Sequence, residues 1–156
     1  MKIFVFIIIS LIIIDFFYKG NDGWQLDSWK ELKKQIVEEY NFIEEIEIHG
    51  TSPTLIITFT IDEKVPLRTI ESIFEKTKKF LFSEEVFPEL IEYHHELYGG
   101  TTMEIHIIFT YTKEDDPYYY DFYSHKKESG VPKSTSFETW YIEYDNVKRE
   151  YTPVEE

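Results

Sequence analysis

The spacing of apolar residues changes from a helical to a strand-like period and back along this chain, and this change constrains the fold more than any other feature. The first such segment covers residues 28–41, where large apolar side chains recur three and four positions apart. That spacing predicts an amphipathic helix. Ser28 and Glu31 fit a capping box, so we expect the helix to begin at Ser28. Its predicted buried stripe comprises Trp29, Leu32, Ile36 and Tyr40.

From residue 45 the period becomes two, which predicts strands. Isoleucine alternates with glutamate and histidine over residues 45–49, and apolar residues alternate mainly with threonine over residues 54–62. The turn signal Gly50-Thr51-Ser52-Pro53 separates the two strands. We therefore predict a hairpin whose register places Ile48 opposite Leu55.

Helical spacing returns after Pro66 and predicts a second helix that ends near Phe82. Alternation resumes over residues 103–111 and predicts a further strand. Residues 88–98 between them fit either a helix capped by Gly99 or a strand joined to the next by a loop at residues 98–100. The abundance of Glu and Leu favours the helix.

The remaining chain contains an aromatic run at residues 118–123 and a final predicted hairpin. Its strands cover residues 137–144 and 147–151, with Asp145-Asn146 as a two-residue turn. The order of elements predicts an α+β fold in which two or three helices pack on one face of an antiparallel sheet. We assign residues 26–152 to a single globular domain and residues 153–156 to a frayed tail.

An apolar segment, IFVFIIISLIII at residues 3–14, precedes this domain. We predict that residues 1–19 form a single transmembrane or signal-anchor helix, followed by a short linker at residues 20–25. Small residues suited to signal-peptide cleavage are scarce there, although a cleaved signal, which would make the protein secreted, stays an alternative. An N-terminal signal of this kind places the domain outside the cytoplasm, with the opposite topology open.

The formal net charge is −14 and is spread along the chain, so a nucleic-acid partner is not expected. The chain contains no cysteine, which excludes disulfides, thiol chemistry and a cysteine-based zinc site. No nucleotide-binding or other cofactor motif is present, and we predict no cofactor.

Two polar groupings carry the residue types needed for chemistry. Imidazole and carboxylate groups lie near one another in sequence at Glu92, His94, His95, Glu104 and His106, but without a metal-ligand spacing. A second grouping, Glu45, Glu47 and His49, follows the alternation of a solvated strand face. We predict no metal site and no catalytic residue in either.

Aromatic residues in the last third of the chain form the candidate recognition surface, because Tyr and Trp combine a large contact area with a polar tip. The set is Tyr118, Tyr119, Tyr120, Tyr123, Trp140, Tyr141 and Tyr144. The sequence thus predicts a membrane-anchored, extracytoplasmic, non-enzymatic module that binds protein or glycan. The alternatives are an acidic inhibitor or immunity-type protein that binds a basic partner, and a metal-dependent hydrolase that uses the region of His94 and His106.

Overall fold

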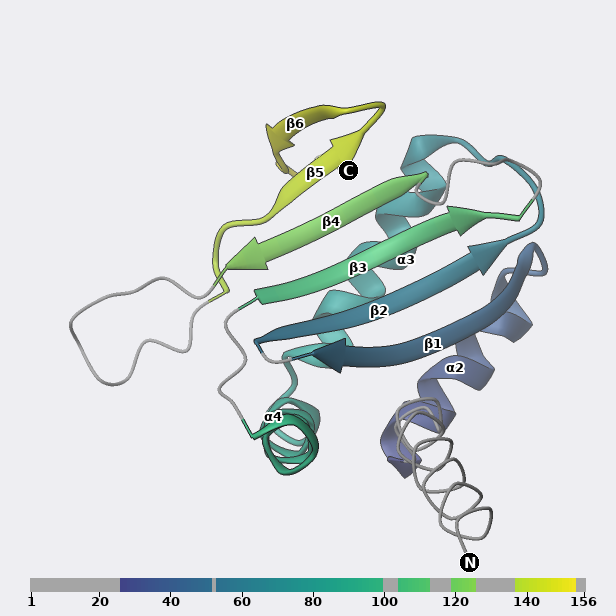
Figure 1. Ribbon diagram of the computed structural model, residues 1–156. Coiled ribbons are helices and arrows are strands. Elements are labelled where there is room, and N and C mark those ends of the chain that lie inside the picture. Colours follow the sequence, from purple (N-terminus) through teal and green to yellow (C-terminus); the bar gives the residue numbers. More distant parts are fainter. Residues whose placement is uncertain (1–25, 52, 100–103, 113–118, 126–136, 154–156) are drawn as a thin grey trace, which may run out of the picture.

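A computed structural model describes residues 26–51, 53–99, 104–112, 119–125 and 137–153, and Figure 1 shows their arrangement. The described chain forms a six-stranded sheet and three helices, an α+β fold. In chain order the elements are α2 (Asp27–Glu39), β1 (Ile43–Thr51), β2 (Thr54–Ile61), α3 (Leu67–Leu81), α4 (Val86–Tyr98), β3 (Glu104–Tyr111), β4 (Tyr120–His125), β5 (Tyr141–Tyr144) and β6 (Val147–Glu150).

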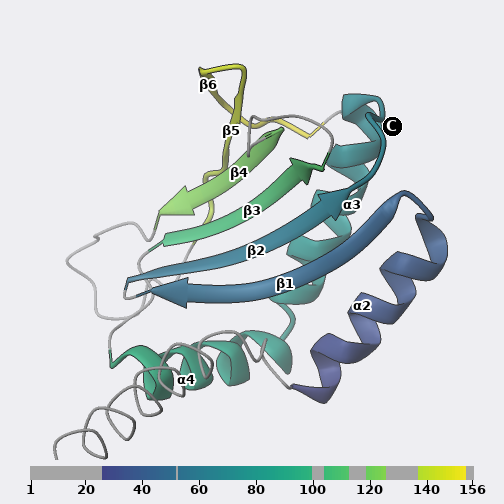
Figure 2. The ribbon, with the colours of Figure 1, turned by 45° about the vertical axis from the view of Figure 1, so that its right-hand side comes forward.

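The strands lie in the sheet in the same order as in the chain, from β1 at one edge to β6 at the other. All neighbours are antiparallel except β2 and β3, which are parallel. The prediction of a purely antiparallel sheet is therefore wrong. The reason is the connection between these two strands: α3 runs back behind the sheet and α4 lies across the end where β2 starts, so that β3 begins at the same end as β2 (Figures 1 and 2).

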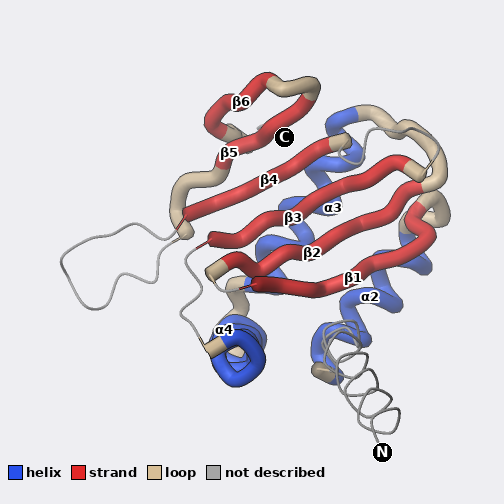
Figure 3. The backbone as a smooth tube through the Cα atoms, in the orientation of Figure 1, coloured by secondary structure: helices blue, strands red, loops and turns tan. Residues whose placement is uncertain are grey.

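Helices α2 and α3 lie behind one face of the sheet and leave the other face open, as Figure 3 shows in blue and red, while α4 lies at the end of the sheet where β2 starts. The covered face is apolar in successive rows that cross the strands. One row runs through Ile48, Ile57, Ile107, Phe122 and Ile142, and every member is buried. Helices α2 and α3 add their own apolar stripes to this core, including Ile36 and Phe74. The predicted α+β fold is confirmed.

Helix α2 begins at Asp27, one residue earlier than the capping box predicts. Leu26 occupies the capping position, and no side chain caps the first turn. The Ser28 hydroxyl instead donates a hydrogen bond of 3.4 Å to the carboxylate of Glu89 on α4. Trp29, Leu32 and Ile36 of the predicted stripe are buried, whereas Tyr40 follows the last helical residue and is half-buried. The periodicity thus located the helix, although the predicted cap was wrong.

Residues 86–98 form a helix, which confirms the favoured prediction for residues 88–98 and excludes the strand. The helix ends at Gly99, whose φ of 68° lies in the left-handed region that glycine adopts without strain. His94 is fully buried on this helix, and its Nε2 donates to the carbonyl oxygen of Thr54 at 3.3 Å. This contact places α4 against the start of β2.

The first hairpin has a different register from the predicted one. Ile48 pairs with Ile57 rather than with Leu55, because β1 continues through Gly50 and Thr51 and pairs Thr51 with Thr54. The predicted turn residues Gly50 and Thr51 thus belong to the strand.

The last hairpin turns at Asp145-Asn146 as predicted. Both residues have positive φ, 51° and 61°, as a type I′ turn requires. Its strands are shorter than predicted, since β5 begins at Tyr141.

The predicted anchor at residues 1–19 and linker at residues 20–25 lie outside the described residues. Among the residues that are described, no helix has the length and apolar character needed to span a bilayer.

Candidate functional site

The open face of the sheet gathers most of the polar side chains that the strands carry. One row across it runs through Glu47, Thr58, Ile108, Asp121, Glu143 and Lys148. The adjacent row runs through His49, Ile56, His106, Tyr123, Tyr141 and Glu150. Because side chains alternate between faces, all of these point away from the helices. The open face is acidic, with Lys148 as its one lysine or arginine among the described strand residues.

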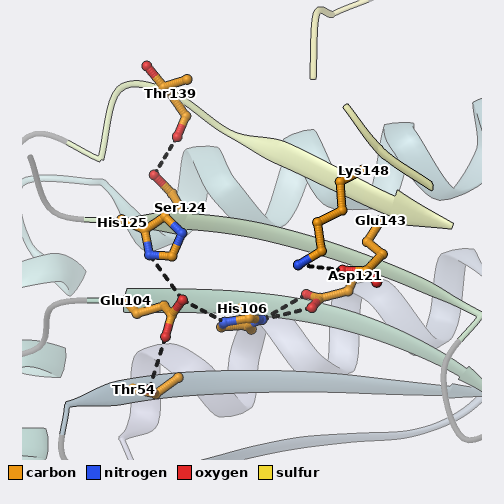
Figure 4. A network of polar contacts seen from close by, with 9 residues as sticks. All are labelled: Thr54, Glu104, His106, Asp121, Ser124, His125, Thr139, Glu143 and Lys148. Atoms are coloured by element: carbon orange, nitrogen blue, oxygen red, sulfur yellow. Dashed lines mark hydrogen bonds and ion pairs between the residues drawn. The ribbon is translucent and has the colours of Figure 1, made fainter. Parts of the chain in front are cut away.

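His106 lies at the centre of a hydrogen-bonded network on this face (Figure 4). Its Nδ1 lies 2.9 Å from the carboxylate oxygens of Asp121, and its Nε2 lies 3.4 Å from Glu104 Oε1. The same Glu104 oxygen lies 3.0 Å from His125 Nδ1, and Thr54 donates its hydroxyl to the other oxygen. The His106 imidazole and the Glu104 carboxylate together thus join three adjacent strands, β2, β3 and β4.

Two opposing effects set the charge of His106. Partial burial lowers its pKa, but the hydrogen bond and negative charge of Asp121, together with Glu104, outweigh burial and raise the pKa above its usual value. An imidazolium between two carboxylates donates from both nitrogens. In that protonated form His106 has no free nitrogen to accept a further proton, and both of its ring nitrogens face carboxylates, which suits a structural or binding role.

Replacing His106 by glutamine is expected to reduce stability more at about pH 6 than at about pH 9. A raised pKa in the folded state means that protonation stabilises the fold below the unfolded pKa, and that this stability is lost as the pH rises through the folded pKa. Thermal unfolding of both proteins across this range measures the difference. In an Asp121→Asn background the pH dependence of the substitution should shrink. A pH-independent loss would contradict the assignment.

Aromatic rings continue the network toward β5. Tyr123 stacks on His106 at 5.4 Å between ring centroids and on Tyr141 at 5.5 Å. The ammonium of Lys148 lies 5.2 Å from the Tyr123 ring centroid and 3.0 Å from Glu143 Oε2. The hydrogen bond with Glu143 raises the pKa of Lys148. This face therefore already holds one cation between a tyrosine ring and a carboxylate.

A groove of about 490 Å³ opens on the same face. Ile56 of β2 and Ile108 of β3 form its apolar floor, and Tyr119 and Tyr144 line it as well. Four carboxylates complete the lining: Glu104, Asp121, Glu143 and Asp145. The groove combines an apolar floor, aromatic rings and negative charge, which together suit a cation with an apolar stem.

The chain matches no protein-family model, no curated protein and no solved structure. The geometry of this face is therefore the basis for a function.

The predicted recognition tyrosines fall into separate groups. Tyr123 and Tyr141 share the open face, although Tyr123 is buried there. Tyr119 and Tyr144 line the groove and contact each other. Tyr120 is buried in the core on the covered face and stacks on Tyr144 at 4.6 Å between ring centroids. Trp140 is 3% exposed and donates its Nε1 hydrogen to the Phe137 carbonyl, so it packs in the core. Tyr118 lies outside the described residues. Recognition by this set stays a prediction.

The histidine and carboxylate groupings are not brought together as a metal site. His94 lies on α4 behind the sheet, whereas His106 lies on the open face. Glu45, Glu47 and His49 do share that face, where His49 Nε2 lies 3.5 Å from the Thr58 hydroxyl. Within the described ranges, no three histidine, aspartate or glutamate side chains are placed to bind a metal ion.

Asp121 and Glu143 were missed as site residues by the sequence reasoning. Asp121 lies within an aromatic run, and its partner His106 is fifteen positions away. Only the strand register places Asp121 beside Ile108 and Glu143. The usable signal was the parity of the aromatic run, which puts Asp121 and Tyr123 on one face and Tyr120 and Phe122 on the other.

Proposed function

We propose that this protein is a non-enzymatic binding module whose open sheet face binds a lysine- and arginine-rich segment of another protein. The observation that carries the proposal is the imbalance of charge on that face. Carboxylates extend from β1, β3, β4, β5 and β6. Among the described residues of these strands, Lys148 is the one lysine or arginine on the face. A negatively charged face of this kind favours a basic partner and speeds the association of that partner.

The form of the surface also supports a protein partner. Tyr141 and Tyr144 bring aromatic contact area next to the carboxylates, and Tyr144 is 48% exposed. Aromatic residues beside charged groups are typical of protein interfaces. A face of hydrogen-bonded strands is also rigid, so little ordering entropy opposes binding. This agrees with the alternative of an acidic inhibitor or immunity-type protein and leaves a glycan as the less favoured ligand.

A selection from a random dodecapeptide library on the full-length chain in zwitterionic nanodiscs tests the proposal. We expect the selected peptides to be enriched in Lys and Arg and to bind about tenfold more weakly when salt rises from about 50 to about 300 mM. Selection of neutral or acidic peptides would contradict the proposal.

Two charge-matched variants identify the surface that binds. The open-face variant carries glutamine at Glu45, Glu47, Glu143 and Glu150. The control carries glutamine at exposed glutamates of the helical side, namely Glu38, Glu84, Glu85 and Glu92. We expect at least about tenfold weaker peptide binding for the first and less than about threefold for the second. Equal losses would show that net charge alone attracts the peptides.

We further propose that the apolar segment at residues 3–14 holds the module at a membrane, with the domain on the extracytoplasmic side. The apolar character of that segment, interrupted by Ser10 alone, supports this location. Membrane fractionation with protease protection of intact cells tests it. Recovery of the chain in the soluble cytoplasmic fraction would refute it.

A further inference from the structure

We infer that the groove on the open face is a pocket for one arginine side chain of the basic partner. This inference deepens the proposed function and rests on it. Three properties of the groove lead to it: an apolar floor, aromatic rings in the lining, and carboxylates on more than one side.

The floor suits the stem of a long cationic side chain. Ile56 and Ile108 lie on adjacent parallel strands, two residues apart in register, and both point out of the open face. Ile108 is only 6% exposed, so the floor is recessed. A methylene chain lying on these two side chains would bury apolar surface while its charged end reaches the rim.

The carboxylates at the rim can accept hydrogen bonds from an additional cationic donor. Glu143 pairs through Oε2 with Lys148, whose side chain is 62% exposed and can move into solvent. Asp145 is exposed in the turn and takes part in no ion pair among the described residues. A guanidinium carries five donors in a planar fork and can bind two carboxylates at once.

The aromatic lining favours arginine over lysine. Tyr119 and Tyr144 line the groove and meet edge to face at 5.9 Å between ring centroids. A planar guanidinium stacks on such rings while its edge stays available for carboxylates, whereas an ammonium acts as a compact point charge. Two lysines of the chain already lie over tyrosine rings. The Lys64 ammonium lies 5.7 Å from the Tyr119 ring centroid, and the Lys148 ammonium lies 5.2 Å from the Tyr123 ring centroid.

Methyl NMR of the full-length chain in zwitterionic nanodiscs tests the pocket with a small probe, Nα-acetyl-arginine amide. We expect the methyl signals of Ile56 and Ile108 to shift with millimolar affinity. Ile57 and Ile107 are internal controls, because each is the neighbour in sequence of a floor residue and points to the covered face. The uncharged citrulline analogue should shift none of these signals. The lysine analogue should bind at least about threefold more weakly than the arginine probe.

A double variant, Glu143→Gln with Asp145→Asn, should lower the affinity for the arginine probe about tenfold. The control Glu47→Gln on the same face should change that affinity by less than about twofold. Asparagine tolerates the positive φ at position 145, so the turn is retained. The inference is overturned if Ile56 and Ile108 do not shift, if lysine binds as well as arginine, or if the control variant weakens binding equally. In each case the peptide selection can still succeed, so failure of the pocket is separable from failure of the proposed function.

Discussion

Replacing Phe74 by alanine is expected to lower the free energy of unfolding by about 3–5 kcal/mol. Phe74 on α3 is fully buried and stacks on Phe122 of β4 at 4.2 Å between ring centroids. Trp140 and Tyr151 meet the same ring edge to face at 5.1 and 5.0 Å. One side chain thus joins a helix, a central strand and the segments that flank the last hairpin. Removing it leaves a cavity that rigid aromatic neighbours cannot close.

Thermal unfolding of the full-length chain, followed by near-ultraviolet circular dichroism, measures this loss. For a chain of this length we expect the midpoint to fall by on the order of 10 °C. Phe74→Leu should lose less, because it retains most of the volume. Val147→Ala, at a side chain that is 63% exposed, is the control and should change stability by less than about 0.5 kcal/mol. A loss below about 1 kcal/mol for Phe74→Ala would show that the core does not depend on this ring.

Replacing Gly50 by alanine is expected to cost about 1–3 kcal/mol, although alanine is the smallest change available there. A β-carbon at this position would lie 2.7 Å from the carbonyl oxygen of Thr54 and 3.0 Å from His94 Nε2. The first of these atoms belongs to the backbone of the paired strand and cannot rotate away. The hairpin and α4 would have to separate, which weakens the hydrogen bond between His94 and Thr54.

Gly99→Ala provides a matched comparison, because a β-carbon there meets nothing within 4 Å and its cost comes from a φ of +68°. Asparagine tolerates that conformation, so Gly99→Asn should recover part of the stability that Gly99→Ala loses. Gly50→Asn should recover nothing, since steric contact rather than φ limits that position. Thermal unfolding of the four variants decides this. Similar behaviour at both glycines would contradict the close approach of α4.

Secondary structure was largely predictable because each segment carries its own period. The stripe of α2, the alternation of β2 and the Gly99 signal after α4 each identified an element without reference to the others. Local signals failed where two elements compete for one side chain. Ser28 was expected to cap its own helix, but its hydroxyl bonds Glu89 of a distant helix.

Pairing was less predictable, since direction and register depend on contacts between segments far apart in sequence. Nothing in the alternation of β3 states whether it runs parallel to β2, because both directions bury Ile105, Ile107 and Phe109 equally well. For the same reason the sequence did not predict the polar network around His106. His106 was a candidate by residue type, but its partner Asp121 becomes visible only when β4 is placed in register beside β3.

The agreement between strand order in space and strand order in the chain bears on how the protein is made. Each strand from β2 onward pairs with the strand synthesised just before it. During translation, at about 5–20 residues per second, every new strand therefore finds its neighbour already outside the ribosome. The sheet can grow from one edge by successive addition, and its acidic face is completed only when the last hairpin, which carries Glu143 and Lys148, has joined.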